Sequence, residues 1–409
     1  MKKNITKIKD NLKKIENKKT KIKSEKKLLE GSRAIALTIN NINPQVISAY
    51  PITPQTHIVE DLAKFKADGQ ANYEYVRAES EFSAASIVLG ASAKGVRTYS
   101  ATSSQGLLLM TEVVYNISGM RLPVVMTLAN RAISAPINIW NDQQDAMAIR
   151  DAGWIMLMAE NNQEAVWQHV LAYKVAEKTG FPVFVNVDGF ILTHCFEPVY
   201  IPDKKTIKKF LPDYKPTTGN YLDTKNPVTL GAFLSPQYYQ TFREKMYNEF
   251  QNTLKEINKE YVNLEKIIKT ELQNKLTTKQ TFTADNGLIE YVGPKKAKTI
   301  VIAMGSVIGT VKTALKDKKD VGILKIKTYR PFPKQAIYDI IKEAKNILVL
   351  EKAVSFGNFS PLYLDIKTVT TDKQIIKNFI GGLGGKDITE KTILEIITKF
   401  NSFKKINFI

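Results

Sequence analysis

Short apolar runs alternate with segments of helical periodicity over most of this 409-residue sequence. The runs VISA, VMTLA and VFVNV are followed by loops of polar, glycine or proline residues, and helical segments such as EFSAASIVLGASA lie between them. Strands that alternate with helices pair in parallel through right-handed crossovers. The order therefore predicts an α/β fold, a parallel sheet with helices on its faces. Because ligands bind at the carboxyl ends of such strands, we expect functional residues in the loops that follow them.

The alternation stops and restarts, which divides the chain into four parts. Residues 1–30 are predicted to be a lysine-rich extension, and residues 31–235 hold the first series of strands and helices. Prolines between about residues 196 and 226 predict an irregular segment within that part. Residues 236–279 are charged and helical in period, which is typical of an amphipathic connector. A second series, with predicted strands at GLIEYVG, TIVIA, GILKIK and NILVLE, makes residues 280–409 a smaller α/β domain.

The composition excludes several classes of protein. Cys195 is the one cysteine, so the chain cannot hold a disulfide framework, an iron–sulfur cluster or a cysteine-ligated zinc ion by itself. With three histidines, a histidine-rich metal site is not expected, and no metal ligand is assigned. No apolar run approaches the roughly 18 residues that cross a bilayer, and the N-terminus lacks the apolar core of a signal peptide. We expect a cytoplasmic protein with no membrane partner.

Positive charge is concentrated at the N-terminus. The formal net charge is +19, and residues 1–27 contain twelve lysines and three acidic residues. Such a segment can bind nucleic acid or another anionic partner. Aromatic residues that stack on bases are missing from it. A solvated extension is therefore the favoured interpretation, and nucleic-acid binding is the alternative.

The first loop with candidate functional residues is Tyr50-Pro51-Ile52-Thr53-Pro54. The two prolines restrict the backbone, so the hydroxyl of Thr53 is held in a set direction at a strand end. The alternative is that Thr53 caps the helix that follows.

A second loop, Glu79-Ser80-Glu81, opens an alanine-rich helix. The helix dipole favours an acidic residue in the first turn, which accounts for one of the two glutamates. The other would enter an apolar interface, where a carboxylate can stay protonated or pair with a basic heterocycle.

Two further loops carry groups that suit anions. In SATSSQGLLLM, residues Ser103, Ser104 and Gly106 leave backbone N–H groups for an anion at a helix N-terminus, although the Walker A ending is missing. Arg131 directly follows the apolar strand LPVVMTLA, and its guanidinium suits a substrate carboxylate. The alternative for Arg131 is a structural salt bridge with Asp142 or Asp145.

Taken in order, the motifs AYPITPQT, ESEFSA, TSSQGL, NRAISAPINIW and DGFILTH resemble the alpha subunit of pyruvate:ferredoxin oxidoreductase, in the thiamine diphosphate-dependent 2-oxoacid:ferredoxin oxidoreductase family. GILKIKTYRPFP and VLEKAVSFGNFSPLYLD resemble the second domain of that subunit. The resemblance covers about residues 30–400 and leaves the tail at 1–27 outside. It implies a thiamine-diphosphate-binding pyrimidine domain followed by a smaller domain like the C-terminal domain of transketolase.

The resemblance also implies roles for particular residues. Glu81 matches the catalytic glutamate that hydrogen-bonds N1′ of the aminopyrimidine and favours the imino tautomer, whose nitrogen removes the C2 proton. Thr53 and Arg131 match residues that contact the oxoacid, with Arg131 at its carboxylate. The other residues that match the cofactor site are Tyr50, Pro51, Ser104, Gln105 and Gly106. Gln143 stands where the resemblance predicts a histidine, which affects any acid–base role of that loop and leaves the carboxylate contact unchanged.

What the sequence lacks implies partners. Thiamine enzymes hold Mg²⁺ and the diphosphate with a G-D-G motif, which does not occur here, and Val187-Asp188-Gly189 lacks the first glycine. The resemblance therefore implies that a beta subunit holds the diphosphate half of a shared site, and that gamma and delta subunits and ferredoxin carry the electrons. The implied reaction converts pyruvate and coenzyme A to acetyl-CoA, CO₂ and reduced ferredoxin. The alternatives are another oxoacid, 2-oxoisovalerate or 2-oxoglutarate, and a non-catalytic scaffold subunit.

Overall fold

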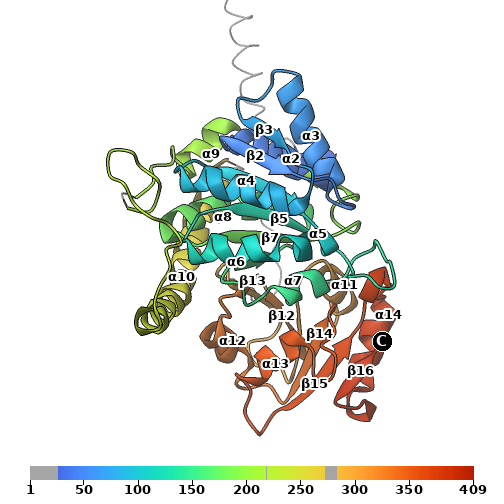
Figure 1. Cartoon of the computed structure of the whole chain (residues 1–409). Coiled ribbons are helices and arrows are strands. Elements are labelled where there is room, and N and C mark those ends of the chain that lie inside the picture. Colours follow the sequence, from blue (N-terminus) through green and yellow to red (C-terminus); the bar gives the residue numbers. More distant parts are fainter. Residues whose placement is uncertain (1–25, 218, 272–282) are drawn as a thin grey trace, which may run out of the picture.

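The computed structural model, which describes residues 26–217, 219–271 and 283–409, contains two seven-stranded sheets and a small two-stranded sheet (Figure 1). The proposed extension up to residue 25 and the end of the proposed connector lie outside the described residues. No helix in these three ranges combines the length and the apolarity needed to cross a membrane.

The first sheet has the strand order β13-β6-β7-β5-β4-β2-β3. Its strands are β2 (Val46–Ala49), β3 (Glu74–Arg77), β4 (Thr98–Thr102), β5 (Val125–Asn130), β6 (Ile155–Met158), β7 (Val183–Asp188) and β13 (Thr328–Arg330). All neighbours pair in parallel except β13, which runs antiparallel to β6. The carboxyl ends of six strands therefore meet at one edge.

Helices cover both faces of this sheet: α2 (Gly31–Ile42), α3 (Thr56–Ala67), α4 (Glu81–Ala93), α5 (Ser104–Leu109), α6 (Thr111–Gly119), α7 (Gln144–Ala148) and α8 (Asn162–Thr179). Successive strand residues point to opposite faces. In β5, Val125 belongs to the apolar cluster of α2, α3 and α8, whereas Met126 belongs to the cluster of α4 and α6. The near-continuous apolar runs in the sequence follow from this double burial.

The second sheet has the order β16-β15-β14-β11-β12-β10-β9. Its strands are β9 (Thr283–Asp285), β10 (Ile289–Val292), β11 (Thr299–Ala303), β12 (Val321–Ile326), β14 (Asn346–Glu351), β15 (Ile375–Ile380) and β16 (Ile406–Phe408). Its helices are α11 (Val307–Ala314), α12 (Lys334–Ile341), α13 (Pro361–Lys367) and α14 (Glu390–Thr398). Ile300 and Leu324 belong to the same apolar cluster as Met126, so one core continues between the sheets.

Three features differ from the pattern that the sequence predicts. Strand β13 follows β12 directly, within the part expected to form the second domain, yet it completes the edge of the first sheet. The segment expected to be irregular contains β8 (Phe196–Val199) and α9 (Lys204–Phe210). Strand β8 pairs with β1 (Lys27–Glu30), which lies inside the predicted extension. Strand β8 contains Pro198. Proline is tolerated there because each strand of a two-stranded sheet has one edge whose N–H groups are not needed for strand pairing.

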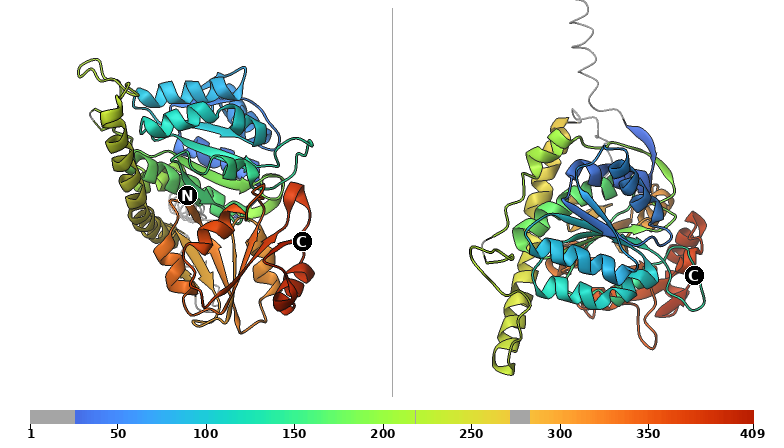
Figure 2. Two further views of the ribbon diagram at one scale, coloured as in Figure 1. Left: turned by 60° about the horizontal axis from the view of Figure 1, so that its bottom comes forward. Right: turned by 45° about the horizontal axis from the view of Figure 1, so that its top comes forward.

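Helix α10 (Pro236–Glu271) is the longest element and runs along one side of the first domain (Figure 2). Its Ile257 and Leu264 are buried in the cluster of α2, α3 and α8, while most of its other side chains face outward. An amphipathic helix of this kind is stabilised by the packing of one stripe.

The two sheets meet at a buried ion pair. Lys352 follows β14 and donates hydrogen bonds of 2.8 Å from Nζ to Asp188 Oδ2, at the end of β7, and to Asn141 Oδ1. Asp188 also accepts the N–H of Ser306 at 3.0 Å. Burial alone raises the pKa of Asp188, but Lys352 and the donated hydrogen bonds lower it below the ordinary value. A second set of ion pairs also links the two sheets. Lys325 of β12 lies 2.7 Å from Glu160 and 2.8 Å from Glu164, which follow β6 in the chain.

Replacing Lys352 with methionine should destabilise the chain by about 3–5 kcal/mol, because Asp188 would be left charged and buried without its partner. The measurement is urea denaturation followed by circular dichroism. Lys399→Met, which removes the exposed pair between Lys399 and Glu395, is the control and should change the midpoint little because solvent screens that pair. Equal midpoints for both variants would contradict the importance assigned to the buried pair.

Candidate functional site

The residues singled out in the sequence gather at the carboxyl edge of the first sheet. Tyr50, Pro51 and Thr53 follow β2, Arg131 follows β5, and Ser104, Gln105 and Gly106 open α5 after β4. Glu81 is the first residue of α4. Arg131 contacts Thr53, and Glu81 contacts Gly106, so neighbouring loops meet there.

Glu81 is a buried carboxylate without a protein partner. It is 7% exposed, and within the described ranges it makes no hydrogen bond and no ion pair. Its side chain lies against Gly106, where a Cβ would come within 2.6 Å of Glu81 Oε1 and 2.7 Å of Thr102 Oγ1. Glycine at position 106 is therefore required for this close approach. A buried charge without a partner is costly, so the carboxylate is suited to a ligand that can hydrogen-bond it.

The structure distinguishes the two glutamates of this loop. Ser80 caps α4 by accepting the N–H of Ser83 at 3.2 Å. Glu79 lies before the helix, is exposed, and accepts a hydrogen bond from the hydroxyl of Ser83, which lowers the pKa of Glu79. Glu81 lies in the first turn and is also buried. Position in the first turn and burial thus coincide in Glu81, whereas the sequence alone predicts one of these properties for each glutamate.

Backbone carbonyl groups hold the side chain of Arg131. Its Nη1 donates to Thr53 O at 2.9 Å, and its Nε donates to Asn138 O at 3.2 Å. Neither Asp142 nor Asp145 forms an ion pair with this guanidinium among the described residues. Burial lowers the pKa of Arg131, and the charge of Asp145 opposes that effect. Among the described residues, the salt-bridge alternative is therefore not realised, and Nη2 of the guanidinium has no protein acceptor.

Thr53 does not cap a helix. Helix α3 begins at Thr56, and its N-cap residue is Gln55. The side chain of Gln55 donates to Tyr50 O at 2.8 Å, which closes the turn beneath Thr53. The hydroxyl of Thr53 is left exposed at the strand end.

Asp145 joins three segments of the site. Its buried carboxylate accepts the N–H groups of Ser104 and Arg131, both at 3.0 Å, and the side-chain amide of Asn130 at 3.0 Å. The N–H of Ser104 is thus satisfied by the protein, so the expectation that this turn binds an anion through it is wrong. Burial raises the pKa of Asp145 to about 6, although the donated hydrogen bonds oppose the rise. The sequence marked Asp145 only as a possible partner of the Arg131 side chain.

Asp142 and Gln143 face the second sheet. Asp142 accepts the N–H of Gln144 at 3.0 Å and of Gly384 at 3.2 Å, and burial raises its pKa to about 7. Gln143 is fully buried and donates from Nε2 to Asp188 at 3.1 Å. Its side chain therefore contacts the ion pair between the sheets, away from the guanidinium of Arg131.

Family models match both parts of the chain. Residues 38–263 match the thiamine-diphosphate-binding domain of pyruvate flavodoxin/ferredoxin oxidoreductases, and residues 297–393 match core domain II of pyruvate:ferredoxin oxidoreductase. The chain belongs to the pyruvate:ferredoxin oxidoreductase family. This confirms the resemblance and the predicted α/β fold with its thiamine-diphosphate-binding domain.

Curated relatives of this oxidoreductase family match nearly the whole chain. Pyruvate synthase subunit PorA of Methanosarcina barkeri is 44% identical, over 92% of this chain and 93% of the relative. PorA of Thermotoga maritima is 40% identical, over 89% and 91%. Ketoisovalerate oxidoreductase subunit VorA of Pyrococcus horikoshii is 37% identical, over 90% and 92%.

A solved structure of another oxidoreductase has the same fold. The 2-oxoglutarate:ferredoxin oxidoreductase from Magnetococcus marinus superposes with a TM-score of 0.67 at 21% identity. The alignment covers 92% of this chain and 65% of the longer chain of that oxidoreductase. The longer chain therefore holds parts without a counterpart here.

The raised pKa of Asp142 predicts a pH-dependent stability. The folded state binds this proton more tightly than the unfolded state, so Asp142 disfavours folding progressively as the pH rises from about 4 to about 7. Asp142→Asn removes this contribution. The melting temperature of the variant minus that of the wild type should become more positive between pH 5 and pH 8. Asp151→Asn, at an exposed aspartate, is the control and should follow the wild type; parallel curves for Asp142→Asn would contradict the assignment.

Proposed function

We propose that the chain is the alpha subunit of a cytoplasmic pyruvate:ferredoxin oxidoreductase. The complex would oxidise and decarboxylate pyruvate in the presence of coenzyme A, giving acetyl-CoA, CO₂ and two electrons for ferredoxin. The observation that carries the proposal is the buried, unpartnered carboxylate of Glu81 against Gly106, within the domain matched as thiamine-diphosphate-binding. The PorA relatives at 40–44% identity favour pyruvate as the substrate.

The residues around Glu81 fit the pyrimidine half of thiamine diphosphate. Within the part of the chain that the structure describes, Glu81 is an acceptor with no protein donor, and Gln105 Nε2 is a buried donor with no protein acceptor. A ring with both basic and donor nitrogens satisfies such a pair. Bound thiamine diphosphate would supply a carbon nucleophile for the oxoacid carbonyl and accept the electron pair released with CO₂. We assign the cofactor contacts to Glu81 and to Tyr50, Pro51, Ser104, Gln105 and Gly106.

Glu81 can act in proton transfer because of where its carboxylate lies. A carboxyl oxygen that lies next to a ring nitrogen can hold a proton and share it with that nitrogen. The close contact with Gly106 places the carboxylate directly against the first turn of α5. We therefore assign the catalytic role to Glu81 and none to the exposed Glu79.

Arg131 and Thr53 form the proposed oxoacid site. The hydrogen bonds to Thr53 O and Asn138 O fix the plane of the guanidinium and leave Nη2 for a carboxylate oxygen. The exposed hydroxyl of Thr53 stands beside it and can donate to the same substrate. The geometry of Arg131 and Glu81 favours a catalytic subunit over a scaffold.

The remaining half of the cofactor site is assigned to a partner. Asp188, in the segment that comes nearest to a G-D-G motif, is already bound by Lys352, Ser306 and Gln143, so it is not free for Mg²⁺. We propose that a beta subunit holds Mg²⁺ and the diphosphate. Gamma and delta subunits would hold the iron–sulfur clusters that a chain with one cysteine cannot ligate.

A branched oxoacid is the second candidate substrate, because the VorA relative is 37% identical over 90% of the chain. The deciding experiment is to purify the native complex and to measure ferredoxin reduction with pyruvate, 2-oxoisovalerate and 2-oxoglutarate. A kcat/KM highest for pyruvate supports the first assignment, and one highest for another oxoacid overturns it.

Glu81→Gln should lower kcat by about 10²–10⁴-fold, because glutamine keeps the size of the side chain but cannot share a proton with the cofactor ring. The measurements are turnover in the reconstituted complex and hydrogen–deuterium exchange at C2 of bound thiamine diphosphate. Glu79→Gln is the matched control, and its exchange rate should stay near the wild-type rate. Wild-type exchange in Glu81→Gln, or loss of exchange only in Glu79→Gln, would show that the catalytic glutamate is misassigned.

Arg131→Lys should raise KM for the oxoacid by about 5- to 150-fold and leave thiamine diphosphate affinity unchanged. Lysine keeps the charge but loses the planar fork, a difference of about 1–3 kcal/mol for a charged hydrogen bond. Arg77→Lys, at an exposed position on β3, is the control. An unchanged KM would remove Arg131 from the substrate site.

A further inference from the structure

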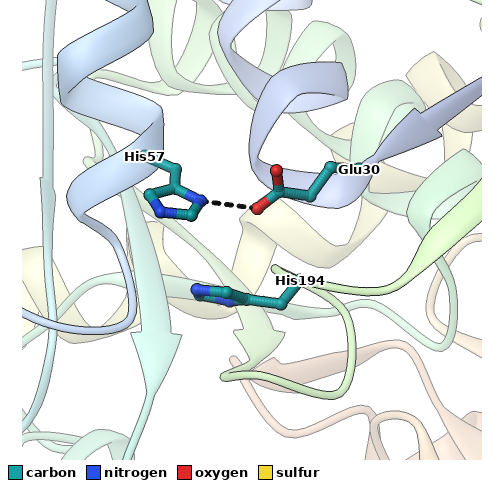
Figure 3. A group of neighbouring side chains, drawn as sticks. All are labelled: Glu30, His57 and His194. Carbon is teal, nitrogen blue, oxygen red and sulfur yellow. Dashed lines mark hydrogen bonds and ion pairs between the residues drawn. The ribbon is translucent and has the colours of Figure 1, made fainter.

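Three side chains that the proposed function does not use come together beside the site (Figure 3). Glu30 ends β1, His57 lies on α3, and His194 lies in the loop between β7 and β8. One donor atom of each lies within 4.8 Å of the donor atoms of the other two. His57 Nδ1 is 2.7 Å from Glu30 Oε1, and the two imidazole rings are 4.8 Å apart between centroids.

The backbone fixes two of these residues relative to each other. Glu30 pairs with Phe196 in the sheet of β1 and β8, two residues beyond His194. The N–H of Ser32 donates to Thr193 O at 2.9 Å, and the N–H of Gly31 donates to Cys195 O at 3.2 Å. A Cβ on Gly31 would lie 2.0 Å from Leu192 O, so this close approach requires glycine.

We propose that Glu30, His57 and His194 bind one divalent cation of the zinc type. Two imidazoles and one carboxylate are a donor set that zinc takes in proteins, with water in the fourth position. Mg²⁺ and Ca²⁺ prefer oxygen donors, so the two histidines select against them. Ligands of tetrahedral zinc lie about 3.3 Å apart, so the exposed side chain of His57 must move inward when the ion binds.

The surroundings of His194 leave one ring nitrogen for the ion. Its Nδ1 lies 2.8 Å from Thr193 Oγ1, which also accepts the N–H of Phe190 at 2.8 Å. When Nδ1 donates to this hydroxyl, the lone pair is on Nε2, which is the arrangement of metal-bound histidines. The ring of Phe190 packs on the imidazole at 4.6 Å between centroids and restricts its rotation. The cation would replace the direct hydrogen bond between His57 and Glu30.

A cation at this position would join segments that border the proposed active site. His57 lies four residues after Thr53, and Phe190 packs on Trp140 at 6.0 Å between centroids. Phe190 and Trp140 also line a cavity of about 480 Å³ beside Lys352. The ion would hold α3 and the loop after β7 to β1. This inference does not depend on the proposed function.

The test uses the full-length chain without a polyhistidine tag, treated with chelator and titrated with Zn²⁺ by isothermal calorimetry. We expect saturation at one Zn²⁺ per chain in the wild type. His57→Ala, His194→Ala and Glu30→Gln should each weaken binding by at least about 10-fold. Two controls should bind like the wild type: Glu60→Gln, at an exposed residue of α3, and Cys195→Ser, which removes the exposed thiol next to His194.

Two further measurements separate ligation from folding. In EDTA the variants should melt at the wild-type temperature, and added Zn²⁺ should raise the melting temperature of the wild type and the controls only. Thr193→Val should keep the stoichiometry and weaken binding by about 10–100-fold, because it removes the acceptor that orients His194. The proposal is overturned if the wild type shows no saturable site, if binding survives in both histidine variants, or if it is lost in Cys195→Ser.

Discussion

The buried ion pair between Lys352 and Asp188 joins the carboxyl edges of the two sheets, and the arrangement of the site loops depends on it. Lys352 reaches across from the second sheet to the end of β7 and also binds Asn141, in the loop that follows Arg131. The end of that loop, at Asn141, Asp142 and Gln143, is therefore buried between the two domains. Since a buried lysine and a buried aspartate are each costly alone, the pair favours a single relative placement of the sheets.

A second buried carboxylate fixes the site within the first domain. The carboxylate of Asp145 accepts hydrogen bonds from the N–H of Ser104, after β4, and from the N–H of Arg131, after β5. These two bonds align the loops that carry Ser104 and Arg131. A hydrogen-bond donor to Glu81, by contrast, is absent from the described part of the protein. The same edge thus combines a polar group that is fully satisfied internally with one that is available to a ligand. Whether the protein itself supplies hydrogen-bond donors thus distinguishes the structural carboxylate of Asp145 from the proposed catalytic carboxylate of Glu81. Residue type and position in a helix distinguish them less clearly.

Much of the fold followed from local patterns, because alternation of apolar runs and helical segments indicates a parallel sheet with helices between its strands. The motif residues Glu81, Thr53 and Arg131 were also located correctly at one edge, since loops after parallel strands share it. Contacts between distant segments were not visible. Three kinds of contact join residues 27 to 172 positions apart: the pairing of β1 with β8, the acceptance of the Ser104 N–H by Asp145, and the meeting of Glu30, His57 and His194. No local spacing encodes such contacts.

Strand β13 has a consequence for how this polypeptide could have been assembled in evolution. The strand belongs by sequence to the C-terminal half and by hydrogen bonding to the N-terminal sheet. A gene rearrangement that exchanged the C-terminal half for an unrelated domain would leave β6 as an open edge with unpaired backbone groups, which invites aggregation. The two halves are thus separable as regions of sequence but interdependent as physical bodies, and shuffling would have to conserve this strand even if every residue of the catalytic edge stayed in place.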